Sequence, residues 1–513
     1  MARKCTSFNR QSRRQSWIGA SLLAFLFLLL TSTAPAYAAG STANAQVTVN
    51  LHQTLSTLSR VALGVNDAVW DGNLLDSQLP NLLHDAGVKV MRYPGGSTAD
   101  VYHWQTNTTE PGQSYANPNN TFDAFMSVVQ ATGATPIITV NYGSGTPQEA
   151  AAWVQYANIT KHYHIKYWEI GNELYGNGSY GANWEYDLHA QKGPVAYANN
   201  SLQFIQAMKA ADPSIKIGAV LTAPGNWPDG VIAPGDTLDW NHTVLSILGE
   251  NVDFAAVHWY AQGPTGESDA GLLAAPANGE STSVSYTPSI PSMVSTLRSL
   301  FAQYTGAKAS SEQIMVTETN SVSYNTGKQT VSLVNALFLA ENELTWLENG
   351  VTNVDWWDVH NGASGGNNNS SSLYGSAQYG DYGILSNGSC AGAGNCEPAA
   401  ETPFPAYYGL QIISKVIGEG GQIVATSSSQ GLVNAFAVKR EDGSVAVLLI
   451  NTDPSTTYTV TLSGLYHAGD ATVYSYGENS TSVTATHEGG DNASVQVIAP
   501  YSLTAVVLSS EGD

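Results

Sequence analysis

Two glutamates that close apolar segments have the chemical type and the placement needed to cleave a glycosidic bond. Glu173 ends the run Tyr167–Glu173, and Glu318 ends the run Ile314–Glu318, 145 positions later. Such cleavage needs one carboxyl group that protonates the leaving oxygen and a second, ionised carboxylate that faces the developing oxocarbenium ion. A single strand-end glutamate more often caps a helix, whereas two on different parallel strands would meet at the mouth of a barrel. The pair therefore predicts a sugar-cleaving site.

The strand that carries Glu173 also holds a rival carboxylate, Glu169. Side chains alternate along a strand with a period of two, so Glu169 shares the inward face with Glu173 but lies more than one barrel layer deeper. We expect Glu169 to be a paired core carboxylate. Asn172 directly precedes Glu173, and its amide is expected to bond a sugar hydroxyl beside the reacting carbon.

Polar residues at the ends of two other predicted strands complete the candidate site. His258 and Tyr260 point the same way, so Tyr260 can donate a hydrogen bond to Glu318 on the neighbouring strand. Arg92 precedes a Pro-Gly-Gly turn, and a guanidinium in a barrel mouth keeps a nearby carboxylate ionised. The structural alternatives are a core histidine, a packing tyrosine and an outward arginine. We treat all three as candidate substrate-binding residues.

Trp356 and Trp357 end the last predicted strand. Adjacent side chains on a strand point to opposite faces, so one indole faces the barrel interior, where it makes a floor for a sugar ring. The other packs against a helix, and the sequence leaves open which is which. Both are therefore candidate substrate-binding residues.

Apolar runs that alternate with helical stretches must position these side chains. The runs predict strands at Val61–Val65, Val88–Tyr93, Thr135–Asn141, Tyr167–Glu173, Ile215–Val220, Phe254–Tyr260, Ile314–Glu318 and Val351–Asp358. Helices are predicted at Leu74–Ala86, Phe122–Thr132, Pro147–Asn158, Val195–Ala211, Thr243–Leu248, Ser292–Tyr304, Thr330–Asn349 and Tyr407–Ile417. Eight such units predict an α/β fold, a (β/α)8 TIM barrel over residues 61–418. A doubly wound sheet would need a phosphate-type glycine loop after the first strand, and Gly64-Val65-Asn66-Asp67 is not one.

The predicted loops are long after strands and often short after helices, as in barrel enzymes whose sites lie at the carboxyl ends of the strands. The long loops are Pro94–Thr121, Leu174–Pro194, Ala261–Pro291 and His360–Pro405. The last carries Cys390 and Cys396, for which export makes a disulfide the expected state. We therefore expect this loop to be an ordered wall.

The chain beyond the barrel is of a different kind. Residues 419–513 contain alternating apolar runs separated by turn residues, which predict a C-terminal antiparallel β-sandwich. Residues 39–60 contain one alternating strand with no neighbour, and we expect it to join the sandwich. The sandwich has no aromatic row that would mark a sugar-binding face, so we expect a mainly structural role.

The N-terminus has the features of a signal peptide. A basic head precedes an apolar run at Trp17–Leu30 and the small-residue site Ala36-Tyr37-Ala38, so cleavage is expected after residue 38 and the mature protein is expected to be secreted, without a membrane anchor. The mature chain keeps 14 Lys and Arg against 41 Asp and Glu, a balance of −27. That charge repels nucleic acid and suits a neutral carbohydrate partner. No CxxC pair or HExxH stretch suggests a metal, and we expect no cofactor.

Together these motifs resemble clan A of the glycoside hydrolases, which are retaining enzymes on (β/α)8 barrels. Within the clan, Arg92-Tyr93-Pro94-Gly95-Gly96, Tyr102-His103-Trp104 and the stretch from Lys166 to Glu173 look most like the α-L-arabinofuranosidases, which also carry a C-terminal β-sandwich. The resemblance implies that Glu173 is the acid/base and Glu318 the nucleophile. It also implies that Asn172 contacts the sugar and that Arg92 and Tyr260 position Glu318.

Three departures from the arabinofuranosidase pattern concern the sugar. Ser97 stands where that family has Asn, no counterpart of its sugar-binding Glu lies near Asn66-Asp67, and the ending Trp356-Trp357-Asp358 is foreign to it. The alternative function is an endo-acting β-glucanase or xyloglucanase of the same clan. An alternative of another class is a non-catalytic carbohydrate-binding protein, and a metal-dependent hydrolase is a more distant one.

Overall fold

The computed structural model describes residues 41–281, 286–418, 420–465, 470–489 and 493–509. The predicted signal peptide, residues 1–38, lies outside these ranges. Within them, no helix is both long enough and apolar enough to cross a membrane.

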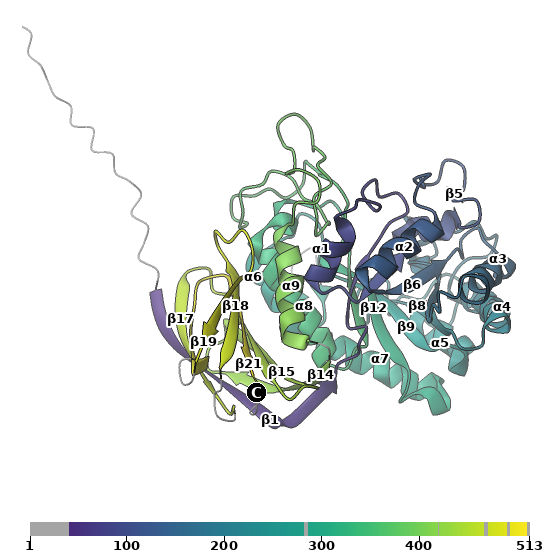
Figure 1. Ribbon diagram of the computed structural model, residues 1–513. Helices are drawn as coiled ribbons and strands as arrows, with labels where there is room; N and C mark the ends of the chain where they lie inside the picture. The colour runs from purple at the N-terminus through teal and green to yellow at the C-terminus, as the bar shows by residue number, and fades with distance from the viewer. Residues whose placement is uncertain (1–40, 282–285, 419, 466–469, 490–492, 510–513) are drawn as a thin grey trace, which may run out of the picture. The chain divides into compact units, whose positions relative to one another are not determined.

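Eight parallel strands close into a barrel in which each strand pairs with the next along the chain and the last pairs with the first (Figure 1). The strands are β2 (Leu63–Asn66), β3 (Val90–Tyr93), β6 (Thr135–Val140), β7 (Tyr167–Ile170), β8 (Lys216–Leu221), β9 (Phe254–Gln262), β12 (Gln313–Val322) and β13 (Asn353–Trp356). Nearly all their side chains are buried, because the barrel interior covers one face and helices cover the other. This double burial explains the continuous apolar runs, and the predicted barrel is confirmed.

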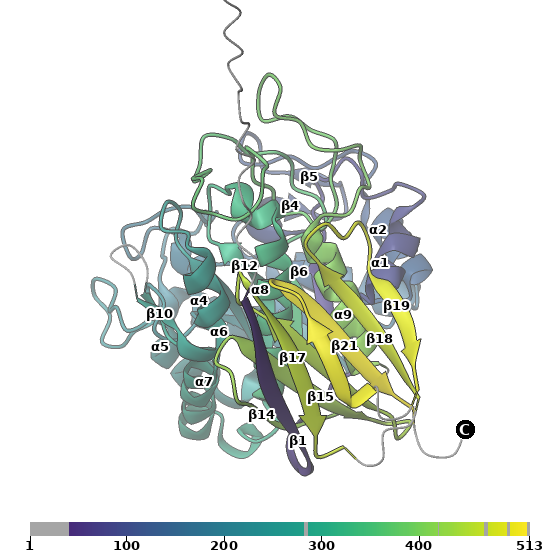
Figure 2. The same cartoon turned by 90° about the vertical axis from the view of Figure 1, so that its left-hand side faces the viewer.

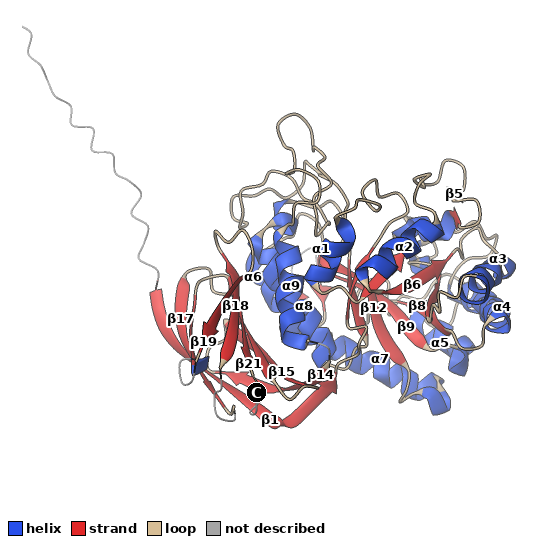
Figure 3. Ribbon diagram, in the orientation of Figure 1, coloured by secondary structure: helices blue, strands red, loops and turns tan. Residues whose placement is uncertain are grey.

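Helices surround the barrel (Figure 3). The longer ones are α1 (Leu79–Ala86), α2 (Phe122–Thr132), α3 (Pro147–Val154), α4 (Pro194–Ala211), α5 (Trp240–Leu248), α6 (Asp269–Asn278), α7 (Ile290–Tyr304), α8 (Leu333–Glu348) and α9 (Pro405–Ile417). Short 3-10 helices form η1 (Gly96–Val101), η3 (Leu174–Gly176), η4 (Gly249–Asn251), η5 (Gly306–Lys308) and η6 (Lys328–Val331), and a π-helical segment, η2 (Gln155–Thr160), follows α3 directly. Two small hairpins pair β4 (Tyr102–His103) with β5 (Thr108–Thr109), and β10 (Glu280–Ser281) with β11 (Tyr286–Thr287).

Helix α6 corrects the prediction of a continuous loop over Ala261–Pro291. Its sequence contains Pro276 and several small residues, so it lacks a clear apolar stripe. The Ser268 hydroxyl accepts a hydrogen bond from the Gly271 amide at the helix start, and Leu272 and Leu273 are buried. Capping and tertiary burial therefore stabilise a helix that periodicity does not reveal.

The loop from His360 to Pro405 is held by internal bonds. The Cys390–Cys396 disulfide is present, as predicted. Glu397 accepts hydrogen bonds from the Ser386 hydroxyl at 2.9 Å and the Asn387 amide at 3.1 Å. These contacts agree with the expectation of an ordered wall.

A buried histidine at the start of this loop should make stability depend on pH. His360 Nδ1 lies 2.9 Å from Asp71 Oδ2, and Nε2 lies 3.3 Å from Glu401 Oε1. Burial lowers the pKa of His360, but the two carboxylates outweigh burial and raise it to about 10. A raised folded-state pKa stabilises the protein below the unfolded value near 6.5, and this contribution is lost as pH rises through about 10.

We therefore predict that His360→Gln lowers the thermal midpoint most near pH 6 and progressively less toward pH 10. The measurement is calorimetry of wild type and variant across that range. His84→Gln, on the exposed surface of α1, is the control and should give a small, pH-independent difference. Parallel pH profiles for wild type and His360→Gln would contradict the assignment.

The C-terminal region forms a curled nine-stranded sheet in the order β19-β18-β21-β16-β15-β14-β1-β17-β20. The bounds are β1 (Ser41–Thr57), β14 (Gly421–Ser428), β15 (Val433–Arg440), β16 (Val445–Asn451), β17 (Thr456–Ser463), β18 (Ala471–Gly477), β19 (Thr484–Glu488), β20 (Val495–Ile498) and β21 (Ser502–Leu508). The N-terminal strand β1 joins it as predicted, lying between β14 and β17 (Figure 2). The β1–β17 pair is parallel, so the prediction of a purely antiparallel sandwich is wrong there. No hairpin constrains β1, because it comes from the other end of the chain.

Strand β16 is buried on both faces, and one of these faces packs toward the barrel. Val447 and Leu449 of β16 lie in the interior of the curled sheet. Leu448 and Ile450, on the opposite face by the period of two, belong to the same apolar cluster as Leu410 of α9. Because both faces of β16 are buried, its sequence is a continuous apolar run.

Candidate active site

The barrel interior is built in layers that lead up to the predicted glutamates. An apolar layer contains Val90, Ile137, Tyr167, Phe254, Ala256 and Met315. Two residues further along their strands stand Arg92, Thr139 and Glu169, which form the next layer by the period of two. Polar groups deep in a barrel must be paired, and this layer is.

Arg92 is the centre of the polar layer and is fully buried. Its Nε donates to Glu169 Oε2 at 2.7 Å, Nη2 to Asn172 Oδ1 at 2.9 Å, and Nη1 to Asn66 Oδ1 at 2.8 Å. Its bond to Glu318 Oε2 is longer, 3.4 Å. Glu169 is thus the paired core carboxylate that we expected, and Arg92 contacts both it and Glu318.

Glu318 reaches the barrel mouth because β12 contains a bulge. Val316 pairs with Val257 and Glu318 pairs with His258, so Thr317 has no partner on β9. The Thr317 hydroxyl donates to Glu169 at 2.9 Å. A bulge allows two consecutive side chains to face the same side, which strict alternation forbids.

Glu173 does not end its strand as predicted. Strand β7 stops at Ile170, because Gly171 has a φ of 73°, and Glu173 is the residue before η3. A Cβ at position 171 would come within 2.4 Å of Leu174 Cδ2, so the close approach also requires glycine. The predicted strand was therefore three residues too long, and the turn rather than the strand aims Glu173.

The two glutamates face each other with separate sets of donors. Tyr260 donates to Glu318 Oε1 at 2.5 Å, as predicted from the strand register. Glu173 Oε1 lies 2.9 Å from His258 Nδ1 and accepts from the Tyr175 hydroxyl at 3.1 Å. One oxygen of each glutamate and Nδ1 of His258 all lie within 4.8 Å of one another.

The pKa values of Glu173 and Glu318 are shifted in opposite directions. Burial raises the pKa of Glu173, but hydrogen bonds from His258, Trp184 and Tyr175 outweigh burial, so its pKa lies below the ordinary value. Burial raises the pKa of Glu318, and Glu173 adds to this rise while His258 and Arg92 oppose it. These directions are the reverse of the roles that the resemblance implies.

His258 lies between the two glutamates, and its pKa is shifted upward. Burial lowers the pKa of His258, but the charges of both glutamates and the bond to Glu173 raise it above its ordinary value. This direction favours a protonated imidazole in the hydrogen bond between His258 Nδ1 and Glu173 Oε1. Among the described residues, Glu173, His258 and Glu318 also form a group that could hold a metal ion.

Hydrogen bonds fix both the backbone and the side chain of Asn172. Its backbone amide donates to Asp100 Oδ2 at 2.8 Å, and its Nδ2 donates to Glu185 Oε2 at 2.9 Å. Glu185 also accepts from the Ser97 hydroxyl at 2.9 Å. Burial, followed by the charge of Asp100, raises the pKa of Glu185 well above its ordinary value. Ser97, one of the departures noted in the sequence, is thus part of this network.

Trp356, the last residue of β13, and Trp357, which follows it, lie in different surroundings, as predicted. Trp356 is fully buried and packs with its ring 6.1 Å from that of Phe338 on α8, so its assignment to substrate binding is wrong. Trp357 is partly exposed and lies against Gly96, where a Cβ would come within 2.7 Å of Cη2. Trp357 therefore adjoins the Pro-Gly-Gly turn at the mouth.

Sequence reasoning missed Glu185 and Trp184. Both lie in the loop after β7, and Trp184 Nε1 donates to Glu173 Oε2 at 2.7 Å. No periodicity marks a residue in such a loop. The one feature of the sequence that could have indicated Trp184 is its place in a loop rich in glycine and asparagine.

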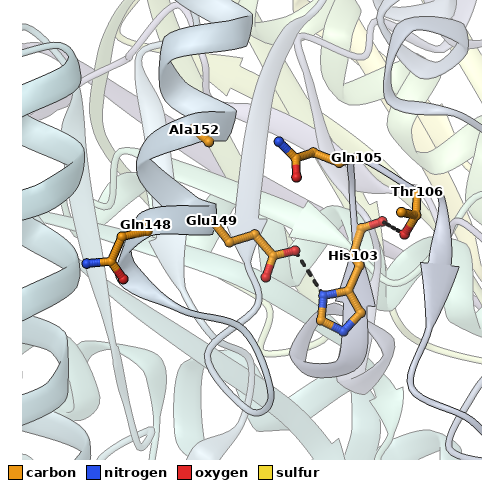
Figure 4. A pocket seen from close by; sticks show the side chains of 6 residues that line it. All are labelled: His103, Gln105, Thr106, Gln148, Glu149 and Ala152. Carbon is orange, nitrogen blue, oxygen red and sulfur yellow. Dashed lines mark hydrogen bonds and ion pairs between the residues drawn. The ribbon is translucent and has the colours of Figure 1, made fainter.

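A cavity of about 440 Å³ has neither Glu173 nor Glu318 in its lining (Figure 4). It is lined by His103, Gln105, Thr106, Gln148, Glu149 and Ala152. His103 Nδ1 lies 2.9 Å from Glu149 and its Nε2 lies 3.1 Å from Glu110. These contacts fasten the β4–β5 hairpin to α3, so we assign the cluster a structural role.

Comparison with known proteins gives partial sequence similarity. No family model matches the chain. The chain is 33% identical over 172 residues to the Aspergillus fumigatus protein named Probable alpha-L-arabinofuranosidase C, in an alignment that covers 29% of this chain and 32% of that protein. The chain thus spans about a third of the length of the curated relatives it matches.

Similarity to solved structures is broader. An α-L-arabinofuranosidase from Thermotoga maritima in complex with arabinose gives a TM-score of 0.66 at 18% identity, covering 91% of this chain and all of that one. CelM2, a bifunctional glucanase-xylanase from a metagenome library, gives 0.66 at 16% identity, covering 92% of this chain and all of that one. At these identities the structures show the fold alone. The chain is therefore similar to α-L-arabinofuranosidases in sequence over part of their length, and it shares their barrel-plus-sandwich fold.

Proposed function

We propose that this chain is a secreted, retaining glycoside hydrolase of the α-L-arabinofuranosidase type that acts on plant or microbial polysaccharides or oligosaccharides without a cofactor. The observation that carries the proposal is the facing pair Glu173 and Glu318, each with its own hydrogen-bond donors, at the carboxyl ends of the barrel strands. The partial sequence similarity to arabinofuranosidases supports the sugar.

The chemistry follows from the two sets of donors. Glu318 attacks the anomeric carbon as the bond to the leaving oxygen breaks, and Glu173 gives that oxygen a proton. Water then hydrolyses the glycosyl ester on Glu318, with Glu173 accepting a proton from the water. Tyr260 orients Glu318, Arg92 favours its ionised form, and His258 exchanges a proton with Glu173.

Retention of configuration is supported by the close approach of the two carboxyl groups. Oxygens of Glu173 and Glu318 lie within 4.8 Å. Retaining enzymes hold their carboxyl groups about 5–5.5 Å apart, whereas inverting enzymes need about 6.5–9.5 Å to admit a water. The short separation of these oxygens therefore supports the retaining type over the inverting type.

The remaining roles rest on neighbouring residues. Trp357 adjoins the mouth and offers an aromatic floor for the sugar. Asn172, which borders Glu173 and is held by Arg92, offers its amide to a hydroxyl of the same sugar. The proposal that the protein is secreted is based on residues 1–38, which have the pattern of a signal peptide.

The second candidate is an endo-acting glucanase or xyloglucanase, favoured by the equal fold similarity to CelM2. The deciding experiment compares hydrolysis of 4-nitrophenyl α-L-arabinofuranoside with that of xyloglucan and β-glucan, with and without a chelator. Release from the furanoside alone, insensitive to the chelator, supports the proposal. Cleavage of the polymers alone moves the protein to the endo-acting type. Sugar binding with no turnover on a wider glycoside panel would leave the non-catalytic binding protein.

Glu173→Ala tests the assignment of the general acid. We expect kcat/KM on natural linkages to fall by roughly 10²- to 10⁴-fold, the usual contribution of a positioned acid or base. The 4-nitrophenyl furanoside should be much less affected, because its leaving group needs little protonation. Glu441→Ala, an exposed glutamate on the C-terminal sheet, is the matched control and should equal the wild type. Equal losses on both substrates would remove Glu173 from this role.

A further inference from the structure

Two exposed tryptophans lie side by side next to the proposed acid. Trp184 is in the loop after β7 and is 41% exposed, and Trp227 is in the loop after β8 and is 51% exposed. Their ring centroids are 5.6 Å apart and their planes are inclined by 49°. Indoles bury large apolar areas when they contact a ligand, so a neighbouring pair left open to solvent needs an explanation.

Trp184 is fixed in place rather than mobile. Its Nε1 donates to Glu173 Oε2 at 2.7 Å. One side presses on Gly176, where a Cβ would come within 2.3 Å of Cε2, and Tyr175 contacts it in an edge arrangement with centroids 6.1 Å apart. The indole of Trp184 is still 41% exposed, and the ring of Trp227 lies beside it.

The bond to Glu173 identifies which part of a substrate would cover these rings. The residue that protonates the leaving oxygen lies beside the leaving group, not beside the sugar that is attacked. Trp184 donates a hydrogen bond to that residue, and Trp227 lies beside Trp184, so both indoles lie next to the place of the leaving group. Sugar rings present faces of C–H groups that stack on indoles.

We propose that Trp184 and Trp227 form a stacking platform for the leaving-group sugars, with the first ring on Trp184 and the second on Trp227. This inference rests on the proposed function and deepens it, because it assigns the substrate as an oligosaccharide or polysaccharide with at least two sugars on the leaving side. Trp184 also holds Glu173, whereas Trp227 contacts the site through Trp184. Trp227 is therefore the cleaner position for a test.

The experiment compares two furanosides that differ only on the leaving side, methyl α-L-arabinofuranoside and α-1,5-linked L-arabinotriose. The readout is the ratio of kcat/KM for arabinotriose to that for the methyl furanoside. We expect Trp227→Ala to lower this ratio by roughly tenfold, as expected for the loss of one aromatic stacking contact and its buried area. Trp227→Phe should restore most of it. Leu432→Ala removes a similarly exposed apolar side chain, 47% exposed, from the C-terminal sheet and should leave the ratio unchanged.

A ratio in Trp227→Ala within twofold of the wild-type value overturns the platform while leaving the proposed function intact. If the wild type cleaves neither furanoside, the platform is tested by affinity electrophoresis in gels that contain arabinoxylan or xyloglucan. Retardation that Trp227→Ala abolishes supports the platform although the sugar assignment fails. Absence of retardation in both gels overturns it. Self-association of the wild type that Trp227→Ala abolishes would identify the pair as a contact between copies of the chain and would also overturn it.

Discussion

Glu318→Gln is expected to lower kcat/KM by on the order of 10⁴-fold or more for every glycoside that the wild type cleaves, because an amide cannot form the covalent ester. Glutamine has almost the same shape and can still accept hydrogen bonds from Tyr260 and Arg92. The fold should therefore persist, which circular dichroism and the thermal midpoint check. Glu441→Gln, on the exposed surface, is the matched control and should retain full activity.

A covalent intermediate distinguishes this nucleophile from a general loss of activity. Rapid quenching followed by mass spectrometry should detect a glycosylated peptide that contains Glu318. The adduct should accumulate in Glu173→Ala, because that variant lacks the base for the second step, and should be absent from Glu318→Gln. A product of inverted configuration, or an adduct on Glu173, would assign the roles differently.

Arg92→Met is expected to lower the free energy of unfolding by about 3–5 kcal/mol, the typical cost of removing one partner of a buried ion pair. Arg92 and Glu169 are both fully buried and lie 2.7 Å apart, so the variant leaves a carboxylate without its counter-charge. Asn66 and Asn172 also lose the donor that orients their amides. Urea unfolding followed by tryptophan fluorescence gives the free energy of the transition that includes the barrel.

The double variant Arg92→Met/Glu169→Leu separates the lost ion pair from lost packing. It should be more stable than Arg92→Met alone, because it removes the uncompensated charge together with the cation. Its activity should remain low, since Glu318 and Asn172 still lack the guanidinium. A single variant Arg92→Met that unfolds at the wild-type urea concentration would show that the pair contributes little to stability.

The barrel and several site contacts could be predicted because they depend on local pattern. Parallel strands covered on both faces must be apolar along their length, so β3 and β9 are recognisable as runs. Side-chain direction along the strands then placed Tyr260 within reach of Glu318 and Glu169 in the barrel core, since side chains alternate with a period of two. The Cys390–Cys396 disulfide was predictable from its spacing and the expected compartment.

Other features could not be predicted because they depend on contacts between distant segments or on single backbone angles. Helix α6 is stabilised by a serine cap and tertiary burial, and β1 pairs in parallel with a strand more than 400 residues away. Gly171 ends β7 early, and the bulge at Thr317 reverses the expected alternation in β12. The last two change where Glu173 and Glu318 lie without changing the apolar pattern.

The sequence by itself determined the barrel, the two glutamates, and the polar residues that strand ends bring to one mouth, because burial and alternation are encoded residue by residue. Only the tertiary structure decided which tryptophan adjoins that mouth, that Arg92 pairs with Glu169 more closely than with Glu318, and that Trp184 holds Glu173. Loops have no periodicity, so the positions of their side chains are set by the packing of the whole barrel. Trp184 and Trp227 are of this kind, because their contact joins the loops that follow β7 and β8.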